Sequence, residues 1–471
     1  MHLPPSPACD LLGNAVPIVL AGMGGVARSE LVAAVTDGGG FGFLGMVREP
    51  AELIEQEVER LRQLGHRRFG VNIIPAATNP MLLEHQVAAC IRLAVPVVGT
   101  FWDLDQRVTR RLRDAGILVV HQVGSVDEAI EAARAGVEIV IAQGREAGGH
   151  VRGVRPLRDL LPDVVSAVKV PVLAAGGLAT GGDLVTAMAL GAAGIVCGTA
   201  LMATEEAFAH AYHKQRLLAA ETDDTVLTSS FHINWPASAP VRVLKSAVTS
   251  GARGDAYAPD KTVIGADAGR PIYLFSTDSP LRSTTGDIEA MALYAGTGVG
   301  HIAEICGAGD WLRNIVAEAE NLLALESDVV EEIEASSPVC YANEMQGDYT
   351  GLISGGELAS ELWLLTAQMH AALRATLALG TDTAAPSQPP FAPGAVPFAS
   401  WVLRLKKIAI SASQGKSRHP IELRLSQAAS ADPILHHALI LQGLGALVPR
   451  VAASEMQGRL VQLRNFIESS A

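Results

Sequence analysis

The chain has 471 residues, a formal net charge of −13 at pH 7, and a composition that is 49% hydrophobic but only 4% aromatic. Its length allows two or three domains, or one large α/β barrel with an appendage. An acidic chain is not expected to bind nucleic acid, which needs clustered Lys and Arg, and its 46 glycines favour α/β packing over an aromatic-rich β-sandwich. The composition still allows small-molecule ligands, including anions.

Three features favour a cytoplasmic location without membrane contact. The five cysteines stand singly, with no Cys-x-x-Cys pair, as is typical of reduced thiols. The first residues, MHLPPSPACD, lack the basic and apolar segments of a signal peptide. Residues 184–204 are uncharged and long enough to resemble a membrane span, but three glycines interrupt them, so buried barrel interior is expected instead.

From residue 17 to residue 202, short apolar runs alternate with longer amphipathic ones. The runs predicted to be strands are 17–21, 41–46, 69–74, 96–102, 117–123, 139–144, 170–177 and 194–202. Most segments between them open on a capping Ser or Asp or close on a Gly, as helices do. This alternation predicts a (β/α)8 TIM barrel over residues 1–202. An open doubly wound sheet is the alternative, although no G-x-G-x-x-G follows the first strand in the right context.

Two further regions follow the predicted barrel. Residues 203–325 form a polar, loop-rich insert whose helical periodicity returns at 286–325, and they are expected to cap the substrate side of the barrel. Residues 326–471 are expected to form a mainly helical extension with a Pro-rich link at 383–398. A basic stretch at 404–425 is interpreted either as a docking surface for an acidic carrier protein or as a solvated helix face. The same extension is also considered as the contact between copies of the chain in a homo-oligomer.

The carboxyl ends of the strands carry the active site in a barrel of this kind. Gly176 and Gly177 follow the seventh predicted strand, and Gly198 and Thr199 lie near the end of the eighth. Exposed backbone N–H groups at these exits can converge on a phosphate, which predicts a phosphate-bearing cofactor. The alternative is that the glycines only permit tight turns and helix packing.

Three amide side chains stand near strand ends, namely Asn72, Gln122 and Gln143. Amides offer both donors and acceptors, which suits a heteroaromatic ring with alternating N–H, N and C=O groups. No lysine ends a strand where a Schiff base would need one, so a flavin fits better than a pyridoxal or nicotinamide ring. Amides that are satisfied within the protein are the alternative.

A single histidine, His150, follows Gly148 and Gly149 at the exit of the sixth predicted strand. There it could act as a general base or as a cation that holds an anionic substrate, although a lone histidine is more often structural. No metal site is predicted, because His419, His436 and His437 lack companion ligands at suitable spacing.

The segments AQGREAGGH (142–150), GVNIIPA (70–76) and PVLAAGGLATGGDLVTAMALGAAGIVCGTALMATEEAFAH (171–210) resemble the nitronate monooxygenases, formerly called 2-nitropropane dioxygenases. These are FMN-dependent barrels that oxidise alkyl nitronates with molecular oxygen. The resemblance extends through FHINWPASAPVRVL (231–244) and TGDIEAMALYAGTGVG (285–300) and covers about residues 15–325. Residues 326–471 have no counterpart in the family.

The resemblance implies a catalytic role for His150 and a place near the substrate for Tyr294. The strand exits and the resemblance together predict a set of FMN-binding residues: Gly22, Met23, Asn72, Gln122, Gln143, Gly148, Gly149, Gly176, Gly177, Val196, Cys197, Gly198 and Thr199. The sequence departs from the family at Val196 and Thr297, where glutamine is frequent. Backbone contacts to the phosphate would tolerate the first departure, whereas the second weakens any expectation about the substrate.

The implied reaction is the oxidation of an alkyl nitronate, or of a nitroalkane once His150 has removed its α proton, to a carbonyl compound and nitrite. An FMN-dependent NAD(P)H reductase of enoyl thioesters or quinones is the alternative on the same scaffold, because related sequences share the Gly-Gly-His turn. A further hypothesis makes the C-terminal extension a docking module in a biosynthetic assembly.

Overall fold

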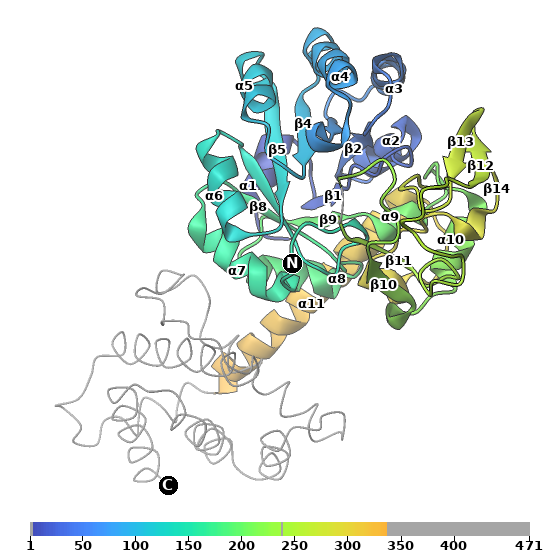
Figure 1. Cartoon of the computed structure of the whole chain (residues 1–471). Coiled ribbons are helices and arrows are strands. Elements are labelled where there is room, and N and C mark those ends of the chain that lie inside the picture. The colour runs from blue at the N-terminus through green and yellow to red at the C-terminus, as the bar shows by residue number, and fades with distance from the viewer. Residues whose placement is uncertain (1–2, 237–238, 337–471) are drawn as a thin grey trace, which may run out of the picture. The chain divides into compact units, whose positions relative to one another are not determined.

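Eight parallel strands close into a barrel in the computed structural model, which describes residues 3–236 and 239–336 (Figure 1). In barrel order they are β1 (Ile18–Leu20), β2 (Phe41–Gly45), β3 (Gly70–Ile73), β4 (Val97–Phe101), β5 (Leu118–Val123), β6 (Ile139–Gln143), β8 (Val172–Ala175) and β9 (Ile195–Cys197). Each lies inside one of the predicted runs, so the predicted (β/α)8 TIM barrel is confirmed. Its residues belong to one compact unit, Met1–Leu323.

Helices surround the barrel on its outside (Figure 1). They are α2 (Ser29–Asp37), α3 (Ala51–Gln63), α4 (Pro80–Arg92), α5 (Gln106–Asp114), α6 (Val126–Arg134), α7 (Leu157–Ala167) and α8 (Gly181–Ala189). Side-chain caps fix several starts: Asp105 accepts from the backbone N–H of Val108, and Thr180 and Asp183 form a capping box. These caps explain why polar residues between a strand and the next helix predicted where the helices begin.

The core has two layers because successive side chains on a strand point to opposite faces. Ile18 and Leu20 pack outward against the helices, whereas Val19 points into the barrel. Inside, Val19 packs with Phe41, Phe43 and other strand residues, and α1 (Pro7–Leu12) adds Ala8 and Leu12 to the same cluster. Side chains therefore fill the interior, which leaves the carboxyl ends of the strands as the place for a site.

The region after the barrel contains two small antiparallel sheets. The first has the order β10 (Thr225–Thr228), β11 (Val241–Leu244), β7 (Gly149–His150), and the second the order β13 (Arg270–Tyr273), β12 (Val263–Asp267), β14 (Thr284–Gly286). The short helices α9 (Thr199–Met202) and α10 (Ala211–Leu218) precede β10 in the chain. The strand β7 ties the first sheet to the barrel, because it belongs to the loop that follows β6.

Helical periodicity at 286–325 predicted the structure of that segment only in part. Two 3₁₀ turns, Ile288–Ala290 and Thr297–His301, precede the helix α11 (Ala308–Ser336). Glycines at 296, 298 and 300 explain the difference, since glycine disfavours a continuous α-helix.

Helix α11 runs through the predicted boundary between residues 325 and 326. The Pro-rich link at 383–398, the basic stretch at 404–425 and their proposed docking role lie outside the described residues. Among the residues that the structure covers, no helix is long and apolar enough to span a bilayer.

Two buried histidines that do not line the cavity make the free energy of unfolding depend on pH. His121, on β5, contacts the hydroxyl of Thr100 at 2.8 Å, and His213, on α10, contacts the carbonyl oxygen of Tyr294 at 3.0 Å. Burial lowers the pKa of each imidazole to about 4, whereas a histidine in the unfolded chain titrates near 6.5. Between these values the unfolded chain binds more protons, so stability is full above pH 6.5 and is lost as the pH falls toward 4.

We expect the free energy of unfolding of the barrel to fall by about 3 kcal/mol per pH unit between pH 6 and pH 4.5 from these two residues. Urea-dependent hydrogen exchange, followed by mass spectrometry on peptides from the barrel strands, measures this slope. His213→Gln should make the slope shallower by about 1.4 kcal/mol per pH unit, and His85→Gln, at an exposed position of α4, should leave it unchanged. Equal slopes in wild type and His213→Gln would contradict the assignment.

Candidate active site at the barrel mouth

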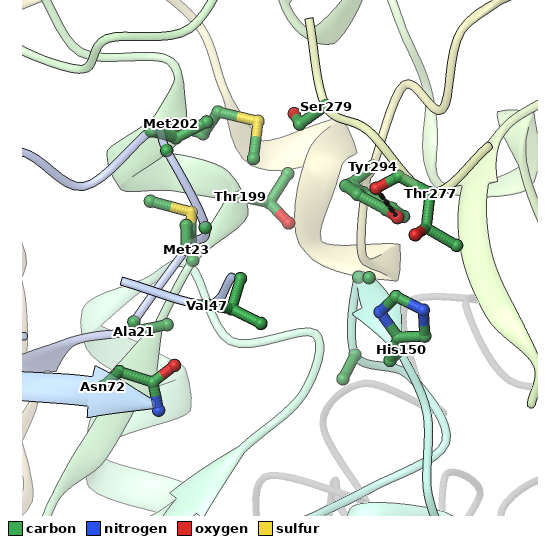
Figure 2. A pocket seen from close by; sticks show the side chains of 18 of the residues that line it. Ala21, Met23, Val47, Asn72, His150, Thr199, Met202, Thr277, Ser279 and Tyr294 are labelled. Atoms are coloured by element: carbon green, nitrogen blue, oxygen red, sulfur yellow. Dashed lines mark hydrogen bonds between the residues drawn. The ribbon is translucent and has the colours of Figure 1, made fainter. Parts of the chain in front are cut away.

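A cavity of about 470 Å³ lies at the carboxyl ends of the strands. Its lining includes nearly all residues that the sequence singled out: Gly22, Met23, Asn72, Gln122, Gln143, Gly148, Gly149, His150, Gly176, Gly177, Val196, Gly198, Thr199 and Tyr294. Figure 2 shows Met23 and Asn72 on one side and His150 with Tyr294 on the other. The fold thus brings together segments that are far apart in the chain.

Cys197 is the exception among the predicted cofactor-binding residues, because its side chain does not line the cavity. The thiol packs in the outer layer of the core and donates to the carbonyl oxygen of Leu178 at 3.6 Å. Burial raises the pKa of this thiol, so it stays protonated. The reason is strand alternation: Val196 points inward, so its neighbour must point outward.

Glycines let the backbone after β1 lie along the cavity. A Cβ atom at Gly22 would stand 2.2 Å from the Cβ of Asn72, and one at Gly45 would stand 1.8 Å from the carbonyl oxygen of Met23. The Asn72 side chain is itself held in place, since its amide donates to the carbonyl oxygen of Gly99 at 3.3 Å. The turn therefore has no room for a side chain at position 22.

The exits of β8 and β9 present backbone donors to one end of the cavity. Gly176 and Gly177 have φ values of 118° and 71°, in the left-handed region that glycine adopts readily. Within the described part of the chain, the N–H groups of Gly177, Gly198 and Thr199 donate to no other protein group. The Thr199 hydroxyl accepts from the Gly296 N–H at 2.9 Å instead, which ties this end to the capping region.

The three predicted amide side chains differ in their hydrogen-bond partners. Gln143 is almost fully buried: its amide donates to the carbonyl oxygen of His150 at 2.9 Å, and its oxygen accepts from the N–H of Arg152 at 3.0 Å. Its side chain is therefore satisfied by the backbone of His150 and Arg152, as the structural alternative proposed. In the part of the chain that the structure describes, the Asn72 oxygen and the Gln122 amide have no such protein partner.

Aromatic side chains enclose the His150 ring. It stacks on Trp235 with ring centroids 3.4 Å apart and planes inclined by 20°, and it meets Trp102 edge-on at 6.3 Å. The Tyr294 ring lies 5.9 Å away, and its hydroxyl donates to the carbonyl oxygen of Thr277 at 2.8 Å (Figure 2). The Nε2 atom of His150 is shielded from solvent and has no hydrogen-bond partner among the described residues.

The electrostatic surroundings keep His150 neutral. Burial, and secondly the positive charge of Arg48, lower the pKa of its imidazole well below 6.5. Burial also raises the pKa of the Tyr294 phenol, which therefore stays protonated. A neutral imidazole has a nitrogen that can accept a proton but carries no charge to hold an anion, so the lowered pKa argues against the cationic role.

Sequence reasoning did not single out Arg48, Trp102, Trp235 or Asp278 as site residues. Arg48, Trp235 and Asp278 line the cavity, and Trp102 packs behind them against His150. A signal was present for two of them, because Arg48 follows the second predicted strand closely and Trp102 ends the fourth. Trp235 and Asp278 come from the insert, where no periodicity indicated which residues return to the barrel.

The family model for nitronate monooxygenase matches residues 6–318. The chain belongs to the nitronate monooxygenase family. A probable nitronate monooxygenase of Staphylococcus haemolyticus is 34% identical over 260 residues, which cover 46% of this chain and 72% of that protein. A carboxyl-CoA dehydrogenase of Rhodococcus jostii is 35% identical over 219 residues, 46% of this chain and 61% of its own.

Among solved structures, nitroalkane oxidase from Streptomyces ansochromogenes superposes with a TM-score of 0.55 at 30% identity, over 68% of this chain and 99% of its own. As a member of the nitronate monooxygenase family, the protein is a flavin-dependent oxidoreductase. No cluster of three or more His, Cys, Asp or Glu side chains suited to a metal ion occurs within the residues described.

Gly22→Ala should weaken flavin binding by about 5- to 150-fold, because the new methyl group overlaps Asn72 and overpacking costs about 1–3 kcal/mol. The flavin-to-protein absorbance ratio and a flavin titration measure the effect. The matched control is Gly182→Ala on α8, where a Cβ meets nothing closer than 3.6 Å. Full flavin occupancy and wild-type affinity in Gly22→Ala would show that the turn does not line the flavin.

Proposed function

We propose that the protein oxidises alkyl nitronates with molecular oxygen, using FMN, to carbonyl compounds and nitrite. One observation carries the proposal: the Nε2 atom of a neutral His150 and the N–H groups of Gly177, Gly198 and Thr199 belong to one cavity, and none of them has a hydrogen-bond partner among the described residues. Membership of the nitronate monooxygenase family and the likeness to a nitroalkane oxidase support it.

The residues present fit FMN. A cavity of about 470 Å³ is within the range of pockets that bury small organic ligands. The backbone donors of Gly177, Gly198 and Thr199 suit a phosphate, and the Asn72 oxygen and the Gln122 amide suit the polar edge of the ring. When bound, the flavin supplies the electron transfer between substrate and oxygen.

The side chains around the proposed flavin-ring site have different roles. Trp102 and Trp235 shield His150 from water and fix the plane of its imidazole. A nitronate arrives without its α proton, so His150 orients it, whereas a neutral nitroalkane must first give that proton to the imidazole. The overall reaction balances when two nitronate anions and one O₂ yield two carbonyl compounds and two nitrite ions.

His150→Asn should lower kcat/KM with a nitroalkane by about 10²- to 10⁴-fold, because the general base is lost. Oxygen consumption and nitrite release measure turnover, and the visible spectrum should report unchanged flavin content. The matched control is His232→Asn, since His232 also stacks on an aromatic ring, that of Tyr257 at 4.6 Å, but does not line the cavity. Wild-type turnover in His150→Asn would refute the role.

The alternative function is an FMN-dependent NAD(P)H reductase. The likeness to the carboxyl-CoA dehydrogenase favours a thioester substrate for that alternative. Anaerobic mixing separates the two functions: we expect the flavin absorbance to persist when NAD(P)H is added and to fall when propane-2-nitronate is added. Rapid bleaching by NADH or NADPH, with no response to the nitronate, would favour the reductase.

A further inference from the structure

Arg48 brings a positive charge to the His150 end of the cavity. It has a φ of 57°, in the left-handed region that non-glycine residues rarely adopt, and its side chain lines the cavity. Its charge acts on both His150 and Tyr294. The strained turn after β2 therefore directs a cation toward His150 in the cavity.

The Arg48 guanidinium makes one side-chain hydrogen bond within the described residues. One Nη2–H group donates to Asp278 at 3.3 Å, while the Nε atom is buried without a partner in the described residues. The pair is 26% and 32% exposed, and Asn234 also contacts Asp278, at 3.4 Å. An ion pair that is so long and partly solvated is weak. Asp278 thus orients the guanidinium without satisfying it.

A second donor without a partner among the described residues lines the same cavity. The Nε1 atom of Trp235 is buried without a hydrogen-bond partner in the described part of the chain, and its ring stacks on His150. Arginine and tryptophan side chains donate hydrogen bonds and accept none. A buried donor without a hydrogen-bond partner costs free energy. A ligand group that only accepts hydrogen bonds would pair with both donors.

On the basis of the proposed function, we propose that Arg48 is a substrate-binding residue whose guanidinium pairs with the two oxygens of a planar oxyanion, the nitro oxygens of a nitronate, while Trp235 donates to the same group. The planar fork of a guanidinium matches a planar pair of oxygens. The neutral His150 lacks the charge for this task and is left as the base. A carboxylate has the same chemistry and serves as a probe.

Calorimetric titration of the flavin-loaded protein tests the assignment. The probe is isobutyrate, a carboxylate with the shape of propane-2-nitronate, and isobutyramide is its neutral counterpart. Arg48→Gln should weaken isobutyrate binding by about 10- to 100-fold, the usual effect of losing a hydrogen bond to a charged group, and leave isobutyramide binding within about twofold. Arg48→Lys should restore part of the loss, and Trp235→Phe should cause a smaller one while keeping the ring on His150.

The matched control is Arg253→Gln, which removes a positive charge from an exposed pair with Asp287 away from the cavity and should leave both affinities unchanged. Unchanged isobutyrate affinity in Arg48→Gln would overturn the proposal. The affinity of the wild-type protein for isobutyrate should also fall when NaCl is added, and this test requires no variant. An affinity that does not depend on salt would also overturn the proposal. If nitronate is not oxidised but isobutyrate binding still depends on Arg48, the proposed reaction fails and the oxyanion site stands.

Discussion

The two hydrogen bonds that Gln143 makes with the backbone of His150, on β7, and of Arg152, just after it, connect the barrel to the first small sheet. Its amide binds the backbone on both sides of Val151, so the segment that carries His150 is fixed to the end of β6. Because β7 pairs with β11, the same contacts anchor the first capping sheet. Trp235 and Tyr294 reach His150 through that sheet and its neighbouring loops. A polar side chain at the end of a buried strand thus determines where the histidine and its aromatic neighbours stand.

Charge is distributed unevenly along the cavity. The backbone N–H groups at the exits of β8 and β9 offer partial positive charge, which suits a phosphate without a cationic side chain. Near His150, Arg48 brings a positive charge that Asp278 pairs at 3.3 Å, and burial keeps His150 neutral beside it. The same surroundings keep the imidazole unprotonated at neutral pH, so its nitrogen can accept a proton, but they also make it a weaker base. Base and cation are therefore separate residues.

Unfavourable local features gather around this cavity. Among the described residues, eight buried side-chain polar atoms have no hydrogen-bond partner, and four of them belong to cavity-lining residues, Arg48, His150, Trp235 and Ser279. Arg48 and Asn234, which also line it, have left-handed backbones. Unpaired polar groups and backbone strain cost stability and persist where the surrounding structure enforces them. Their concentration at one site is what a preorganised ligand-binding site requires.

The sequence by itself determined the barrel, because strand and helix periodicities are local properties and eight short apolar runs alternated with amphipathic ones. Glycines at the strand exits and the position of His150 could be predicted for the same reason. The direction of a side chain at a strand end needs the register, so Cys197 was assigned to the cavity although it faces the outer core. Only the tertiary structure decided that the backbone of His150 and Arg152 satisfies Gln143 and that Arg48, Trp235 and Asp278 meet near His150. Those contacts join residues up to 230 positions apart, and no local pattern encodes which distant loops close over a barrel.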